Sequence, residues 1–188
     1  MRRLLPDSSL AGAAISGLLL ALAFPAAGIS LLAWIGLVPL LLGMERRPFQ
    51  SGFTAGLVFF ASVLYWLNIV MTTYGRLSPF LSVAAYLLLA SYLALFFAAA
   101  TWAACRLKAR LGYSFLLTLP VFWVALEFLR EFLLTGFPWA SLGYSQQTLW
   151  MIQSADLFGV YGLSFLLVLD LFVKDCVRRN GSVFGQTI

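Results

Sequence analysis

The residues best placed to do chemistry lie in one apolar segment. Glu127, Arg130 and Glu131 are separated by three and four positions, so on a helix they share one face. A charged side chain at the centre of a bilayer costs at least ~2.5 kcal/mol, so such a face needs a purpose. Two interpretations stay open: a polar face turned towards a lipid headgroup or catalytic partner, or an arginine-centred ion pair near the outer interface.

The segment that follows has an unusual composition. Residues 135–147 carry no charge but contain two glycines, a proline and three aromatic side chains. Backbone freed by glycine and proline is tolerated at membrane depth only where protein covers it or a cavity adjoins it. We therefore expect a shaped, lipid-facing loop that includes Gly136, Phe137, Pro138, Trp139, Tyr144 and Gln146. The alternative is an ordinary interfacial belt of aromatic residues.

Three further features are less specific. Trp66 belongs to the aromatic and polar cluster 65–68, which is either an interfacial aromatic belt, the more common case, or a second candidate for contact with a substrate at similar depth. Asp156 interrupts the last apolar run and either caps a helix or lines a cavity. Gly52 and Gly56 permit a close approach between helices, from which we infer no dimer.

Several kinds of active site are excluded. The sequence contains no histidine, which removes Ser-His and Cys-His nucleophile pairs and histidine metal ligands. Cys105 and Cys176 lack the spacing of a zinc site or a disulfide framework. No nucleotide-binding loop or nucleophile elbow is present. We therefore assign no catalytic residue, no metal and no cofactor from the residues themselves.

Composition identifies the elements that must position these residues. Of 188 residues, 62% are hydrophobic and 10% are charged, against about 25% charged in soluble domains. The charges form short clusters between long uncharged stretches, which is typical of loops between membrane spans rather than of a nucleic-acid groove. At roughly 20 residues per crossing, we predict an all-α integral membrane protein, a bundle of about six transmembrane helices. Their expected positions are 9–24, 29–44, 52–72, 79–104, 113–134 and 150–173.

The basic residues predict the orientation. If the N-terminus is cytoplasmic, ten Lys and Arg side chains lie on the inside, and Arg76 is alone in the outer loops. This bias places both termini in the cytoplasm. We expect residues 1–173 to form one polytopic membrane domain, followed by a short basic cytoplasmic tail, 174–188, that is either native or the product of a frameshift.

Several motifs resemble the membrane domain of apolipoprotein N-acyltransferase. The sequence from Glu127 to Arg130 and the stretches 135–139, 143–146 and 158–162 carry the resemblance, which extends from about residue 10 to 169. Additional similarity lies in 22–25, 32–40 and 56–66. The resemblance implies a multi-pass protein of the bacterial inner membrane, acting in lipoprotein biosynthesis.

What the resemblance implies about activity is specific. That family transfers an acyl chain from a phospholipid to the α-amino group of a diacylglyceryl-cysteine lipoprotein, through a thioester on a nitrilase-like domain with a Glu-Lys-Cys triad. That domain does not occur in this sequence. The resemblance therefore predicts an N-terminal fragment that is inactive alone, with phospholipid and lipoprotein as partners and a missing or separate nitrilase-like domain. No nucleic acid is expected.

One alternative belongs to a different class. A small six-span substrate-binding subunit of a membrane transporter has a similar length and also lacks catalytic residues. The match between residues 127 and 146 favours the acyltransferase.

Overall fold

The computed structural model describes residues 8–111, 115–146, 153 and 155–170. Within these ranges every regular element is a helix, which confirms the prediction of an all-α chain. The tail 174–188, Cys176 and the basic residues near both termini lie outside the described residues.

The N-terminal third forms a helical hairpin. Helix α1 (Ser8–Leu22) is followed by a turn and by three short pieces: η1 (Ser30–Leu32), α2 (Ala33–Gly36) and α3 (Val38–Gly43). The buried hydroxyl of Ser16 accepts a hydrogen bond of 2.8 Å from the backbone N–H of Leu40, an N–H in the first turn of α3 that has no partner within its helix. This bond fixes the register between the two arms.

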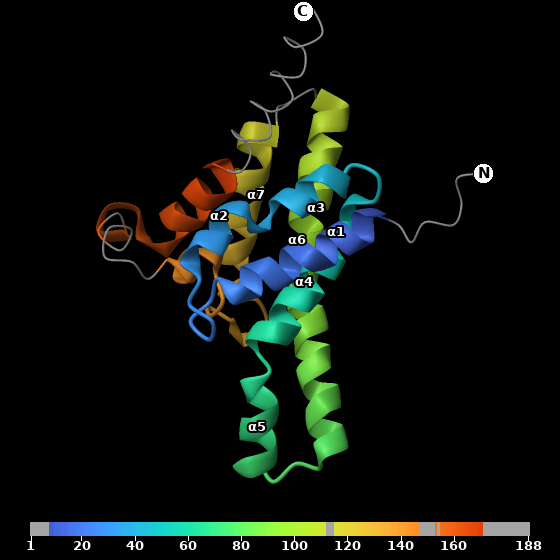
Figure 1. Ribbon diagram of the computed structural model, residues 1–188, viewed down its shortest axis with the longest axis vertical. Helices are drawn as coiled ribbons and strands as arrows, with labels where there is room; N and C mark the ends of the chain where they lie inside the picture. Colours follow the sequence, from blue (N-terminus) through green and yellow to red (C-terminus); the bar gives the residue numbers. More distant parts are fainter. Residues whose placement is uncertain (1–7, 112–114, 147–152, 154, 171–188) are drawn as a thin grey trace, which may run out of the picture.

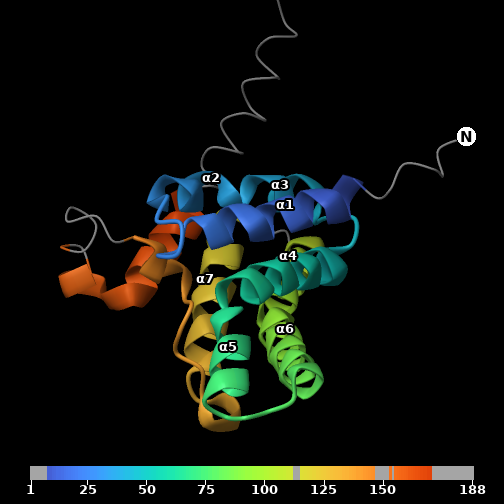
Figure 2. The same ribbon diagram turned by 60° about the horizontal axis from the view of Figure 1, so that its bottom comes forward.

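The middle of the chain contains the longest helix. Helix α4 (Pro48–Val63) continues after a bend of 50° as α5 (Trp66–Thr73), and α6 (Pro79–Leu111) follows. Figure 1 shows α5 and the first half of α6 projecting together from the rest of the structure, while α4 crosses α6 near its middle. Helix α1 packs on α4. Figure 2 shows α1, α2 and α3 as one layer over α4 and the ends of α6 and α7.

The C-terminal part completes the fold. Helix α7 (Phe115–Arg130) packs against α6, and a loop containing η2 (Leu133–Thr135) and η3 (Leu142–Ser145) leads to a final helix, 155–170. A ring cluster joins α4, α6 and α7: Phe59 stacks on Phe97 at 5.5 Å, and Phe97 lies 4.3 Å from Trp123. The cluster forms a rigid base beneath the loop 133–146.

Small residues allow α4 and α6 to approach closely. A Cβ atom added to Gly52 would lie 2.2 Å from Thr101 Oγ1, and one added to Gly56 would lie 2.9 Å from the Cα of Ala94. The Gly-x-x-x-Gly pattern is therefore used for packing inside the chain.

In the part of the chain that the structure describes, one helix, α6, has the length and apolar character to cross a membrane, and the bent pair α4–α5 qualifies if it counts as one span. The other described helices are shorter; α1, with 15 residues, is about 22 Å long against a hydrocarbon core of about 30 Å. Six crossings and two cytoplasmic termini stay predictions.

Candidate functional site

Glu127 supports the loop that follows α7. Its side chain is buried, and its Oε1 accepts hydrogen bonds from the backbone N–H of Leu142 at 2.8 Å and from Trp123 Nε1 at 3.1 Å. The carboxylate thus joins the ring cluster to the start of η3. A buried carboxylate that accepts two hydrogen bonds holds its partners in place, because leaving either donor unpaired would cost free energy.

Arg130 supports the preceding part of the same loop. It is 1% exposed, and its Nη2 donates to the carbonyl of Trp139 at 3.2 Å and to Ser141 Oγ at 2.9 Å. Its guanidinium also lies 5.4 Å from the centre of the Phe60 ring. One arginine therefore connects α7, α4 and the loop, and fixes the backbone on both sides of Ala140.

The chain reverses after α7 at a position that requires glycine. Gly136 has φ +80°, and a Cβ there would lie 2.0 Å from the carbonyl oxygen of Glu131. No larger residue fits without moving the backbone. The next residue, Phe137, donates its N–H to the carbonyl of Arg130 at 2.9 Å, which closes the turn.

The far end of the loop is attached to the N-terminal hairpin. Gln146 Oε1 accepts from Trp34 Nε1 at 3.0 Å, and its Nε2 donates to the carbonyl of Ser30 at 3.1 Å. The backbone N–H of Gly143 donates to Ser164 Oγ at 2.8 Å, which ties the loop to the final helix. The loop is therefore held at both ends.

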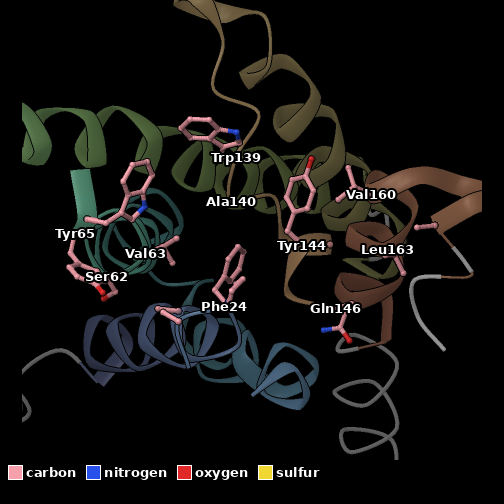
Figure 3. Close-up of a pocket in the computed structure, with 16 residues that line it drawn as sticks. Phe24, Ser62, Val63, Tyr65, Trp139, Ala140, Tyr144, Gln146, Val160 and Leu163 are labelled. Carbon is pink, nitrogen blue, oxygen red and sulfur yellow. The ribbon is translucent and has the colours of Figure 1, made fainter. Parts of the chain in front are cut away.

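Between these attachments lies a cavity of about 650 Å³. Figure 3 shows side chains from four separate segments pointing into it. The lining residues are mostly apolar, with hydroxyl and amide groups among them: Ala21, Phe24, Pro25, Ala26, Ser62, Val63, Tyr65, Trp66, Trp139, Ala140, Gly143, Tyr144, Gln146, Ala155, Val160 and Leu163. A hollow of this size and polarity suits an amphipathic molecule.

Exposed aromatic side chains form part of the cavity wall. The rings of Trp66 and Trp139 lie 6.0 Å apart, and the Trp139 ring also packs at 5.6 Å against Phe137. Trp139 is 57% exposed and Tyr144 is 45% exposed. Indole and phenol groups combine an apolar body with a polar tip, so this wall presents both kinds of surface to the cavity.

The structure divides the predicted site residues into two groups. Trp66, Trp139, Tyr144 and Gln146 line the cavity. The others do not: Glu127, Arg130, Gly136 and Phe137 shape and support the loop, and Pro138 is exposed beside it. A direct role of these five towards a substrate stays a prediction.

Sequence reasoning missed most of the opposite wall. Phe24, Pro25 and Ala26 fall at the break between the expected helices 9–24 and 29–44, and they line the cavity. Val160 and Leu163 come from the helix 155–170, and no residue pattern there predicts which of its faces lines the cavity. Asp156 is exposed and does not line the cavity. Among the residues that the structure describes, no group of acidic or cysteine side chains could hold a metal ion.

Comparison with known proteins identifies the family. Residues 16–170 match the family described as the apolipoprotein N-acyltransferase N-terminal domain. This chain belongs to that family. A relative named apolipoprotein N-acyltransferase in Geobacter metallireducens is 51% identical over 173 residues, which cover 89% of this chain. Relatives of the same name in Nitrosomonas europaea and Methylococcus capsulatus are each 35% identical, over 78% and 92% of the chain.

The match covers only part of each N-acyltransferase. The aligned residues make up 33% of the Geobacter protein, 30% of the Nitrosomonas protein and 36% of the Methylococcus protein. The chain thus spans about a third of the length of these relatives. Residues 16–170 of this chain correspond to the N-terminal domain of these proteins, as the description of the family states.

Proposed function

We propose that this chain forms the membrane part of an apolipoprotein N-acyltransferase, and that its cavity receives lipid substrates. The observation that carries the proposal is the cavity of about 650 Å³ with Trp66, Trp139 and Tyr144 in its wall. A phospholipid donor and a diacylglyceryl-cysteine acceptor both present an acyl chain beside a polar glycerol region. The apolar wall suits the chain, and the hydroxyl and amide groups suit the polar region.

The transfer itself is proposed to take place on a nitrilase-like domain that carries a Glu-Lys-Cys triad. In the first step the cysteine thiolate takes the acyl group and a lysophospholipid leaves. In the second step the amine of the lipoprotein attacks the thioester, an amide forms and the thiolate is released. The role of the present chain is to hold the lipid portions of both substrates in the cavity while that domain acts.

The proposed location is the bacterial inner membrane, with several crossings. Support comes from the apolar character of α6 and of the α4–α5 pair. The basic residues 46, 47, 106, 108 and 110 gather at one end of the molecule, as expected for a cytoplasmic side.

The test replaces the matching segment of the Geobacter metallireducens relative with this chain. The chimera is reconstituted in phospholipid vesicles, and the mass gain of a diacylated lipopeptide measures N-acylation. We expect activity in the chimera and a loss of about tenfold or more in kcat/KM for Trp139→Ala, because about 1.4 kcal/mol of lost contact gives that factor. Phe132→Ala is the matched control, since Phe132 is exposed and does not line the cavity.

Two outcomes would overturn the proposal. One is a membrane-inserted chimera with no activity where the intact relative is active. The other is equal kcat/KM in the Trp139→Ala and Phe132→Ala variants, which would show that the cavity wall at Trp139 does not contribute to binding the lipid substrates.

A further inference from the structure

Basic side chains gather at the end of the molecule opposite the turn that carries Arg76. Arg46 and Arg47 lie in the turn before α4, while Arg106, Lys108 and Arg110 occupy the last turns of α6. Lys108 Nζ lies 2.7 Å from Glu45 Oε1, which brings the two segments together. The segments 45–47 and 106–110 together contain five basic residues and one acidic residue, so they carry an excess of positive charge.

A hollow lies within this basic region. Arg47, Pro48, Phe49, Gln50 and Trp102 line a shallow groove of about 590 Å³. A second depression of about 350 Å³ has Arg47, Phe49 and Gln50 in common with it. Its other lining residues are Leu10, Phe53 and Thr54. The two hollows therefore share Arg47, and the second adds the apolar side chains of Leu10 and Phe53.

The close packing of α4 on α6 fixes the groove. Thr101 Oγ1 donates a hydrogen bond of 2.8 Å to the carbonyl of Pro48. Trp102, the next residue of α6, is thereby placed beside the first turn of α4, and the absence of a side chain at Gly52 permits this approach. The groove is formed by the packed helices α4 and α6 together with Arg47, the residue just before α4.

The groove has the chemical character of a phosphate site at a membrane surface. The guanidinium carbon of Arg106 lies 5.6 Å from the centre of the Trp102 ring, an arrangement that orients its planar donors. Trp102 and Phe49 are each about half exposed. Guanidinium groups match phosphate oxygens, and exposed indole rings favour the depth of lipid headgroups.

We propose that this groove binds the phosphate of an anionic phospholipid in the leaflet on that side of the membrane. The adjoining depression with Leu10 and Phe53 accommodates the start of an acyl chain, which favours a lipid over a soluble phosphate. The proposal rests on the membrane placement given above. It depends neither on acyl transfer nor on the cavity beside Trp139.

The test uses the full chain in lipid vesicles with spin-labelled phosphatidylglycerol or phosphatidylcholine, and measures the motionally restricted fraction of each. We expect the wild type to favour phosphatidylglycerol several-fold. The Arg47→Gln/Arg106→Gln variant should lose this preference, because one basic group in contact with the phosphate already accounts for about fivefold. Arg76→Gln, which removes one charge at the opposite end, should bind as the wild type does.

Equal restriction of both lipids by the wild type, or an unchanged preference in the double variant, would overturn the proposal. A preference abolished by millimolar inorganic phosphate would also overturn it in favour of a soluble anion. If the double variant does not fold, Trp102→Leu with all charges kept should still weaken the preference. Failure of the N-acylation test with the lipid preference intact would contradict only the proposed activity.

Discussion

Arg130 and Glu127 act on the candidate site through the backbone of the loop. Their side chains hold Trp139, Ser141 and Leu142 by hydrogen bonds, and the half-exposed ring of Trp139 forms part of the cavity wall beside Trp66 and Phe137. The spacing of the two charges predicts their shared face. It does not predict the direction of that face, because this depends on a loop that returns over the helix after φ +80° at Gly136.

Replacing Arg130 with methionine should destabilise the protein by about 1–3 kcal/mol, because Ser141 Oγ and the Trp139 carbonyl lose a buried donor. Glu127→Gln should cost less, since an amide oxygen still accepts from the N–H of Leu142. Thermal unfolding of the purified variants in one detergent measures both effects. Asp156→Asn is the control, as Asp156 is exposed. Equal midpoints for Arg130→Met and the control would contradict the supporting role.

Some of the residues that line the cavity were predicted from the sequence. Trp66, Trp139, Tyr144 and Gln146 were identified by their type and their place near apolar segments. The partner of Gln146 was not, because Trp34 lies 112 positions away and nothing local connects them. Contacts of this kind depend on how the helices pack, and a single sequence does not contain that information in a readable pattern.

Among the helices, the pair α4 and α6 contributes to both the ring cluster near the loop and the groove at Pro48. Their contact aligns the ring cluster beneath the loop and also forms the basic groove at Pro48. Both depend on the same small residues at the crossing.

We expect Gly52→Leu to destabilise the protein by at least about 1–3 kcal/mol, because the new side chain would overlap Thr101 Oγ1 and the carbonyl of Phe97. Gln50→Leu adds a similar side chain at an exposed position of α4 and should change stability little. Denaturation followed by tryptophan fluorescence compares the two. A Gly52→Leu protein as stable as Gln50→Leu would show that the helices separate at no cost.

The sequence predicted where helical segments lie better than where they break. The expected helix 52–72 is observed as α4 and α5 with a bend of 50°, and the expected helix 29–44 is observed as η1, α2 and α3. Pro39 and Gly36 account for the second interruption. The bend between α4 and α5 lies at Leu64 and Tyr65, where there is no glycine or proline, so the residue types at that point do not predict it.

For the molecule as a whole, the separation of charge along α6 predicts its orientation. The turn with Arg76 precedes the helix, and the basic groups 106, 108 and 110 are in its last turns. The excess of basic groups favours the cytoplasmic side for the second end.

Cysteine labelling tests this orientation. In a chain with Cys105→Ser and Cys176→Ser, we expect a single cysteine introduced by Arg76→Cys to react with a membrane-impermeant maleimide added outside. A cysteine introduced by Arg110→Cys should react only after the membrane is opened. The reverse pattern would invert the orientation, and labelling of both from outside would show that α6 does not cross.

The length of α6 has a consequence for the bilayer around the protein. Its 33 residues extend about 50 Å, whereas the hydrocarbon core is about 30 Å thick. In the membrane placement proposed above, a surplus of roughly 20 Å would let the helix match thin and thick membranes by changing its tilt, at a modest cost. Bilayer thickness therefore does not determine the height of the Trp139 cavity. In that placement, the exposed tryptophans and the basic end of α6 would set the position of the protein along the bilayer normal.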